Sequence, residues 1–392
     1  MENRTLRSYS QVLQGEPPKT TLFRKEISGI TYRIPVLIYI DDSQTFLAFA
    51  EKRTSPCDYD ATLLVMRRGT RQNGSIQWSP VQELSTACLP GHRTMNPCPV
   101  YEKESKTLFL FFCCVLGKTT EHWQIFTGKN KARLCYVTSK DSGQTWSSST
   151  DLTKIVIGHE ICNWATFAVG PGHGIQMKSG RLIIPAYVYY IHCRCFPFHF
   201  PLCVTSHAFA FYSDDCGTTW CFGERVSTES GECEMAEIVD QGSSALYCNA
   251  RSTKSHRVEA LSESSGAAFD RPHFAQKLVE PCHGCQGSVV SFVAPEEKEN
   301  CLTPNTKTWL LYSHPTDRMK RRALGVYLNK SPFSGSGWSK PWIIHHGPSG
   351  YSDLTQYEES DSFACLMECG KKSELEEIAF VEFSLCDIMN NQ

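Results

Sequence analysis

Short runs of apolar and β-branched residues, separated by polar turns, dominate the chain. They cover residues 31–40, 45–51, 108–115, 183–190, 208–212, 288–293 and 309–312, and most are bounded by Gly, Asp, Ser or Asn. The 3.6-residue period of an amphipathic helix is nearly absent. Regular short strands with turn signals between them are typical of an all-β sandwich, barrel or propeller.

A repeated motif decides between these architectures. The pattern S-x-D-x-G-x-T-W occurs at residues 139–146 and 213–220, and a decayed copy that lacks the Asp and the Trp lies at 262–269. Trp-Ser pairs recur at 78–79, 146–147 and 338–339. A repeat this long that is built from strands indicates propeller blades. At about 60 residues per blade, the 392 residues predict a six-bladed β-propeller.

The chemistry of the motif explains its role as a turn. The Asp carboxylate accepts backbone N–H groups, the Gly supplies an unusual φ angle, and the Trp packs between blades. We therefore interpret the repeats as structural rather than catalytic. Residues 1–22 are predicted to form an N-terminal arm and residues 23–392 a single propeller domain, with the polar stretch 294–307 as a surface loop within it.

Composition and charge exclude several classes of protein. Apolar residues make up 41% of the chain, so a sizeable core can form. The formal net charge of −2 gives no reason to expect a nucleic-acid partner. No run of about 18 apolar residues is present, so we expect no helix that spans a membrane. The N-terminus lacks the apolar segment of a secretory signal.

Cysteine is abundant, with 20 residues, but it points to neither disulfides nor a metal. Many cysteines lie inside apolar runs, as at 112–115 and 364–366, which favours buried, reduced thiols in a cytosol-facing protein. Cys282 and Cys285 have metal-ligand spacing, but no second pair at finger spacing follows them. We expect no metal and no cofactor.

Three arginines stand at predicted junctions between turns and strands. They are Arg33, Arg251 and Arg321. A buried carboxylate ligand needs bidentate, permanently charged donors, which arginine supplies. Each arginine alone is more typical of a surface or ion-pair residue, and the composition does not reveal whether the three converge.

Many ordered motifs together resemble the sialidase family. The sequence Tyr32-Arg33-Ile34-Pro35, followed by two Asp-box (BNR) repeats, is similar to the signature of that family. Further matches between residues 23 and 383 lie at 45–53, 91–99, 164–173, 284–290 and 350–354. Within the family, the chain looks most like the membrane-associated ganglioside sialidases of vertebrates and less like the cytosolic or lysosomal forms. The resemblance implies an exo-α-sialidase that acts on gangliosides and other sialylated glycoconjugates.

The resemblance also implies a role for each site residue. Tyr351 matches the nucleophile, Glu232 its activating base, Asp58 the acid/base, and Glu368 the carboxylate that orients the first arginine. The other residues match contacts to the sugar: Arg33, Arg251 and Arg321 to its carboxylate, Arg53 and Asn96 to its rim, Glu121, Tyr187 and Tyr189 to its N-acyl and glycerol arms, with Gln286 as a further polar contact and Ile34 beside Arg33.

The substrate explains why a tyrosine serves as nucleophile. The anomeric carbon of sialic acid carries a carboxylate, which would repel a carboxylate nucleophile but not a neutral phenol. Some placements remain open. The alternatives are Glu234 or Glu237 for Glu232, Asp60 for Asp58, and Arg318 or Arg322 for Arg321.

The aromatic and cysteine-rich segment 187–203 leaves localisation open. It is too short to span a bilayer, but its Phe196, Phe198 and Phe200 could lie at a membrane interface, next to cysteines available for acylation. The other interpretation is a blade strand followed by a packed loop. We expect peripheral association with the plasma membrane or an endomembrane. The alternatives are a cytosolic sialidase acting on soluble glycans and a non-catalytic propeller that binds glycans.

Overall fold

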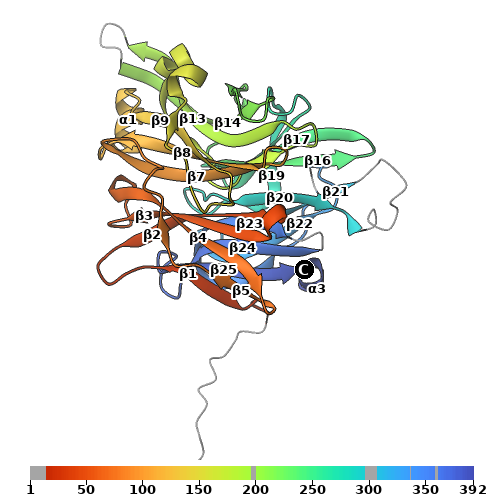
Figure 1. The fold of residues 1–392 in the computed structure, drawn as a ribbon. Coiled ribbons are helices and arrows are strands. Elements are labelled where there is room, and N and C mark those ends of the chain that lie inside the picture. Colours follow the sequence, from red (N-terminus) through yellow and green to blue (C-terminus); the bar gives the residue numbers. More distant parts are fainter. Residues whose placement is uncertain (1–14, 196–199, 296–306, 336, 358–360) are drawn as a thin grey trace, which may run out of the picture.

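The computed structural model describes residues 15–195, 200–295, 307–335, 337–357 and 361–392 (Figure 1). Most of the regular structure in these ranges is antiparallel β-sheet, as the apolar runs predict. Two of the predicted strands have the same bounds in the structure, where they are β2 (Thr31–Ile40) and β20 (Ser288–Val293). The surface loop predicted at 294–307 falls mostly outside the described residues.

The first four blades are separate sheets, and the innermost strand comes first in each. Blade 1 contains β2, β3 (Thr45–Arg53), β4 (Ala61–Gln72), β5 (Ser75–Trp78) and β6 (Gln82–Glu83), and blade 2 contains β7 (His92–Glu102), β8 (Thr107–Leu116), β9 (Ala132–Ser139) and β10 (Thr150–Asp151). Blade 3 contains β11 (Trp164–Val169), β12 (Ile175–Gln176), β13 (Leu182–Cys195), β14 (Phe200–Ser213) and β15 (Cys221–Phe222), and blade 4 contains β16 (Cys233–Asp240), β17 (Ser243–Ala250), β18 (His256–Ser262) and β19 (Asp270–Val279).

Blades 5 and 6 share one long strand, β23 (Trp342–Tyr357). Its first half pairs with β22 and its second half with β24. Blade 5 therefore contains β20, β21 (Thr308–Pro315), β22 (Arg322–Asn329) and the start of β23, and blade 6 contains the rest of β23, β24 (Ser362–Cys369), β25 (Glu377–Ser384) and β1 (Lys19–Arg24). The prediction of six blades is confirmed.

The two ends of the described chain close the ring of blades. β1 pairs antiparallel with β25 and supplies the last strand of blade 6, in which all the other strands come from the C-terminal part of the chain. β1 begins at Lys19, inside the segment expected to be an arm, and the boundary at residue 23 stays a prediction.

Buried apolar side chains fill the spaces between neighbouring blades. Each of the larger clusters draws residues from two adjacent blades, all the way round the ring. The ring centroids of Phe111 in β8 and Trp220 before β15, for example, lie 4.6 Å apart across blades 2 and 3. Because this burial supplies most of the driving force for folding, it also fixes the inner strands relative to one another.

The repeated motifs form the turns expected of them. Asp141 accepts the backbone N–H of Thr145 at 2.9 Å, and Gly143 has a φ of 78°. In the decayed copy Ser264 replaces the Asp, and its Oγ accepts the N–H of Ala268 at 2.9 Å. A hydroxyl therefore substitutes for the lost carboxylate in the same turn.

Helical structure is scarce in the described residues. It consists of the helices α1 (Glu121–Thr127) and α3 (Leu385–Asn390), a π-helical turn η3 (Thr153–Ile157), and the 3₁₀ turns η1 (Asp41–Ser43), η2 (Asp58–Asp60) and η4 (Gly158–Asn163). Among the described residues, the structure contains no helix with the length and apolar character that crossing a bilayer requires.

The segment 187–203 is part of a long hairpin rather than a strand followed by a loop. β13 and β14 pair as far as Cys195 and Phe200 at the tip, which projects from the ring beside α1 (Figure 1). Pro201 lies within β14, so a proline at the end of this hairpin does not prevent strand pairing. Phe196 and Phe198 lie outside the described residues, as does the side chain of Phe200.

Candidate active site

A cavity of about 360 Å³ opens where the inner strands of the blades begin. This volume lies at the lower end of the range for small-molecule sites. The predicted site residues that line it are Arg33, Ile34, Arg53, Asp58, Asn96, Glu121, Tyr187, Tyr189, Glu232, Arg251, Arg321 and Tyr351. The propeller thus brings together residues that are spread over more than 300 positions of the sequence.

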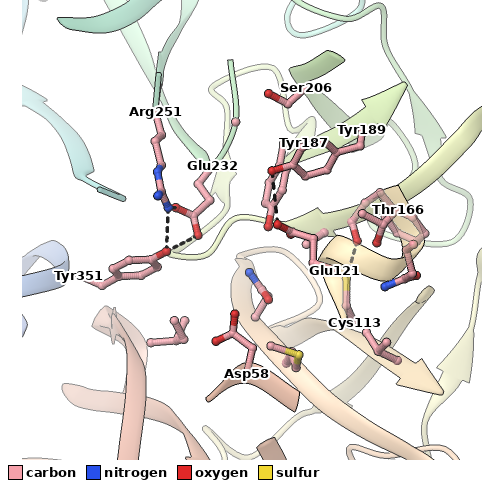
Figure 2. Close-up of a pocket in the computed structure, with 18 of the residues that line it drawn as sticks. Asp58, Cys113, Glu121, Thr166, Tyr187, Tyr189, Ser206, Glu232, Arg251 and Tyr351 are labelled. Atoms are coloured by element: carbon pink, nitrogen blue, oxygen red, sulfur yellow. Dashed lines mark hydrogen bonds and ion pairs between the residues drawn. The ribbon is translucent and has the colours of Figure 1, made fainter. Parts of the chain in front are cut away.

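Tyr351, Glu232 and Arg251 form a hydrogen-bonded triangle on one side of the cavity (Figure 2). The Tyr351 hydroxyl donates to Glu232 Oε1 at 2.5 Å, and Arg251 Nη1 lies 2.7 Å from Glu232 Oε2 and 3.1 Å from the Tyr351 oxygen. Glu234 and Glu237 do not contact Tyr351, because Glu234 binds Ser288 deeper in the ring and Glu237 binds Ser244 near the surface.

The phenol of Tyr351 is held in its neutral form. Burial raises its pKa well above the ordinary value, and the negative charge of Glu232 raises it further, against the opposing effect of Arg251 and Arg321. The hydrogen bond gives the proton a ready path to Glu232. The pair therefore has the geometry of a nucleophile with an adjacent base.

Glu368 joins the start of β2 to the start of the second half of β23. It accepts Arg33 Nε at 2.6 Å and the backbone N–H groups of Ile34 and Tyr351, each at 3.0 Å. It does not line the cavity, so it acts on the site through these three contacts. Burial alone would raise the pKa of Glu368, but Arg33 and the two N–H donors outweigh it and hold the pKa below its usual value.

Ile34 has a backbone conformation that β-branched residues rarely adopt. Its φ is 61°, and Asn96, at the corresponding position of blade 2, has a φ of 56°. Both residues precede a proline and lie at an irregularity in their strand pairing. In each case the backbone N–H is turned toward a buried glutamate, Glu368 for Ile34 and Glu51 for Asn96. Strain of this kind is common where the backbone serves a binding site.

Arg321 is the third arginine of the cavity. Its guanidinium lies 5.3 Å from the centre of the Tyr351 ring and donates to Gly284 O at 3.0 Å. Arg322 points outward to His346 O, and Arg318 is exposed away from the cavity. Arg33, Arg251 and Arg321 all contact or face the Tyr351 side chain, so the three arginines do converge.

Arg53 is buried in the wall of the cavity, where two carboxylates hold it. Glu51 accepts its Nε and Nη2 at 2.8 and 2.6 Å, and Asp58 accepts its Nη1. Glu51 also accepts the backbone N–H of Asn96 at 2.7 Å and so ties blade 1 to blade 2. Sequence reasoning missed Glu51, although it lies two positions before Arg53 and therefore on the same face of β3.

Asp58 lines the cavity from the turn η2, which lies between β3 and β4 (Figure 2). Its side chain is 69% exposed, in contrast to the buried Tyr351. The alternative, Asp60, does not line the cavity and pairs instead with Lys118 at 2.8 Å and Ser55 at 2.7 Å. Of the two residues, only Asp58 has direct access to a bound molecule.

Glu121, Tyr187 and Tyr189 gather opposite Tyr351 (Figure 2). Tyr189 donates to Glu121 at 3.3 Å, and Thr120 caps the helix that begins with Glu121. The carboxylate of Glu121 is open to the cavity, but the surrounding protein strips away most of its water, and Glu232 and Asp58 add negative charge. Together these effects raise the pKa of Glu121 to about 7. This end of the cavity offers hydroxyls and a carboxyl that is readily protonated.

Gln286 lies beneath the cavity rather than in its lining. It is 1% exposed, and its amide binds Glu234, Pro171 O and both backbone groups of Ser352. A direct contact between Gln286 and a ligand therefore finds no support in this placement. The amide has four protein partners and no free face toward the cavity.

Other lining residues were not anticipated from the sequence. Arg93 donates to the carbonyl oxygens of Gly117 and Thr119 at 2.8 and 2.7 Å, and so positions the loop that leads into α1. The remaining polar ones include Thr166, Ser206, Glu229, Ser230, Thr253 and His283. Arg93 lies inside the motif 91–99 and could have been proposed on that ground.

Two groups of residues in the described ranges have the side-chain spacing of metal ligands. One contains Glu102, Glu104 and Cys216 near the surface, and the other His173, Glu234 and Asp353 in the core. In the core group, His173 binds Asp353 at 2.7 Å, and Ser288 binds both carboxylates. These protein hydrogen bonds already satisfy the group.

Comparison with known proteins identifies the family. Residues 44–363 match the model of the BNR repeat-like domain. Sialidase-3 of Bos taurus is 49% identical over 402 residues, which cover 94% of this chain and 93% of that protein. Sialidase-2 of Mus musculus is 45% identical over 375 residues, which cover 94% and 95% of the two chains.

Solved structures share the fold at lower identity. A Trypanosoma rangeli sialidase in complex with 2,3-difluorosialic acid, described as a covalent intermediate, superposes with a TM-score of 0.68 at 16% identity. The match covers 95% of this chain and 59% of that longer one. With near full-length identities well above 30% to named sialidases, the chain belongs to the vertebrate sialidase family and is an exo-α-sialidase, a glycoside hydrolase.

Proposed function

We propose that the enzyme cleaves terminal sialic acid with net retention, using Tyr351 as nucleophile, Glu232 as its base and Asp58 as acid/base. The observation that carries this proposal is the 2.5 Å hydrogen bond from the Tyr351 hydroxyl to Glu232, at the centre of three arginines. Trapping of the covalent intermediate, described at the end of the Discussion, tests it.

In the first step, the Tyr351 oxygen attacks the anomeric carbon as its proton passes to Glu232. The bond to the leaving oxygen breaks, and Asp58 protonates that oxygen. In the second step, Asp58 takes a proton from water, which attacks the anomeric carbon. The bond to Tyr351 breaks, and Glu232 returns the proton to the phenol oxygen. Each step inverts the anomeric carbon, so the product keeps the original configuration.

The arginines account for substrate binding in this proposal. The sialic acid carboxylate lies among Arg33, Arg251 and Arg321, and bidentate hydrogen bonds orient it. Glu368 fixes Arg33, and Glu232 fixes Arg251, so neither guanidinium needs to be ordered when the substrate binds. The positive charge of the arginines also balances the negative charge that the carboxylate brings into the cavity.

The remaining residues define the other end of the sugar. Glu121, Tyr187 and Tyr189 would contact the N-acyl and glycerol arms, while Arg53, Asn96 and Ile34, which also line the cavity, would contact the rim of the sugar. Gln286 would act indirectly, by holding the backbone of Ser352 next to the nucleophile. We assign it a positioning role in place of the predicted contact.

We further propose that gangliosides at a membrane surface are the main substrates. Trp123 and Phe126 on α1 are 40% and 61% exposed, and Leu202 near the adjoining hairpin tip is 68% exposed. Cys193 and Cys203 are exposed on the same hairpin and open to acylation. This apolar surface adjoins Glu121, which begins α1 and lines the cavity, so it would bring the cavity mouth to the headgroups.

A variant with Trp123→Ser, Phe126→Ser and Leu202→Ser tests the membrane proposal. We expect it to move from the membrane pellet to the supernatant. Hydrolysis of mixed gangliosides without detergent should fall at least about fivefold relative to hydrolysis of a soluble fluorogenic sialoside. A variant that still pellets with membranes like the wild type after a wash in neutral buffer would contradict the proposal. A wild type found in the supernatant would favour the cytosolic alternative.

A further inference from the structure

A second hollow, with a volume of about 860 Å³, adjoins the active-site cavity. Arg321 and His283 line both, so the hollow begins where the cavity ends. Its other lining residues come from four separate segments, which blades 5 and 6 bring together: Cys282, Met319, Lys320, Arg322, Pro348, Lys371, Lys372 and Glu374.

Positive charge dominates the lining of this hollow. Lys320, Arg322, Lys371 and Lys372 are exposed, and Glu374 is the acidic residue among the lining groups. In the part of the chain that the structure describes, no ion pair engages the ammonium groups of the three lysines. Lys320 and Lys372 do act on the nearby carboxylates of Asp317 and Glu376, but at a longer range than a salt bridge, so their ammonium groups can still bind an anionic ligand.

Two ordered turns present these lysines. The Glu376 carboxylate accepts the backbone N–H groups of Lys371, Lys372 and Ser373 at 3.0, 2.8 and 3.1 Å. The Asp317 carboxylate accepts those of Met319 and Lys320 at 2.7 and 3.1 Å. Because the backbone of each turn is fixed, a ligand needs to order only the lysine side chains.

We propose that this hollow is a subsite for a second carboxylate in the same glycan, so that the enzyme prefers substrates with two neighbouring sialic acids. The inference rests on the proposed function, since it takes the active-site cavity to hold the terminal sugar. A group in the hollow is then about one sugar away, beyond Arg321. A second sialic acid in the same glycan would bring its carboxylate to this position.

The remaining lining groups suit a sugar better than a phosphate. Met319 is 73% exposed and offers an apolar surface to a sugar ring. Glu374 can accept hydrogen bonds from sugar hydroxyls, and it repels a phosphate dianion more strongly than a carboxylate with a single negative charge. We therefore assign the hollow to a glycan carboxylate and treat a lipid headgroup as the competing outcome.

The test compares a disialyl and a monosialyl oligosaccharide that share one neutral core. The measured quantity is the ratio of the two kcat/KM values. In a variant with Lys320→Ser, Lys371→Ser and Lys372→Ser, we expect this ratio to fall about five- to tenfold, as for the loss of several exposed ion pairs. In the wild type, added salt should lower the same ratio, because exposed charges are screened.

A matched control removes three exposed lysines from other parts of the surface, with Lys103→Ser, Lys140→Ser and Lys340→Ser. It changes net charge equally and should keep the wild-type ratio. The proposal is overturned if the first variant keeps its ratio within about twofold, or if the control loses as much. It is also overturned if the first variant loses binding to phosphatidylserine vesicles while its ratio is unchanged. The ratio does not depend on which residue is the nucleophile, so the test survives a failure of the Tyr351 assignment.

Discussion

The proposed nucleophile with its base and the proposed acid/base have opposite structural settings. Tyr351 and Glu232 lie at the start of inner strands, are less than 10% exposed, and are joined to Arg251 by short hydrogen bonds. Asp58 lies on a 3₁₀ turn between β3 and β4, is mostly exposed, and has Arg53 as its one described side-chain partner. The proposed nucleophile is thus preorganised by the ring of blades, while the proposed proton donor is carried by a surface turn.

This difference follows from what each group must do. A phenol with a raised pKa becomes a nucleophile only if its base stays within hydrogen-bond distance, and a rigid framework maintains that distance. The acid/base must reach a leaving group of variable size and then a water molecule, and an exposed position on the surface allows this. Predictions that separate the nucleophile from the acid/base are therefore the most informative.

Tyr351→Phe should have the largest effect, a loss of at least about 10³-fold in kcat, equivalent to about 4 kcal/mol of transition-state stabilisation. The ring still packs against Ile34 and Cys285, so the protein should remain folded. Turnover of a fluorogenic sialoside and the thermal melting curve measure the two effects. If kcat stayed within about threefold of the wild type, Tyr351 would not be the nucleophile.

Asp58→Asn should have an effect that depends on the leaving group. Natural glycans leave as poorly stabilised alkoxides and need protonation, so we expect kcat to fall about 10²- to 10⁴-fold for them. An aryl sialoside with an acidic phenol leaves without that help and should lose much less. Asp60→Asn is the matched control, because Asp60 pairs with Lys118 outside the cavity. Equal losses on both substrates would contradict the assignment of Asp58.

Arg251→Lys should weaken binding even though it keeps the charge. An ammonium cannot make two parallel hydrogen bonds to a carboxylate, and it also loses the contact with His283 O. We expect KM to rise about tenfold or more, with a smaller change in kcat. Arg318→Lys, at an exposed arginine that lines neither the cavity nor the adjoining hollow, should leave both constants near their wild-type values. If the two variants behaved alike, Arg251 would not belong to the carboxylate site.

Glu121→Gln should have the smallest effect and should appear mainly in the pH profile. The pKa of Glu121 is raised to about 7, so the side chain is neutral below pH 7 and negative above it. The negative form repels an anionic substrate, so the wild-type KM should rise as the pH passes through about 7. The glutamine variant should lack this rise. A KM profile that keeps its inflection in the variant would show that another group titrates there.

Much of the fold could be predicted because the signals are local. Each S-x-D-x-G-x-T-W repeat predicts a turn, and each apolar run predicts a strand. The number of blades then follows from the length of the chain and the number of residues per blade. The closure of the ring by β1 was missed because a strand of six residues near the N-terminus carries no sign of its partner more than 350 residues away.

The site was predictable by resemblance but not by local pattern. Nothing around Tyr351, Glu232 or Arg251 in the sequence states that they meet, since their contacts depend on six blades packing in a ring. Two details have the same origin. Gln286 lies just before β20, and only the folded ring shows that its amide binds the backbone of Ser352. Glu51 was overlooked because the sequence alone does not show whether a glutamate is buried or exposed.

The most direct measurement of the central claim is to trap the intermediate. 2,3-Difluorosialic acid carries a leaving fluoride at the anomeric carbon, and its second fluorine slows hydrolysis of the covalent adduct by destabilising the electron-poor transition state. After incubation and proteolysis, peptide mass spectrometry should place one glycosyl adduct on Tyr351, and Tyr351→Phe should give none. An adduct on Glu232, Asp58 or Glu121, or rapid turnover of natural substrate by a Tyr351→Phe protein, would contradict the account.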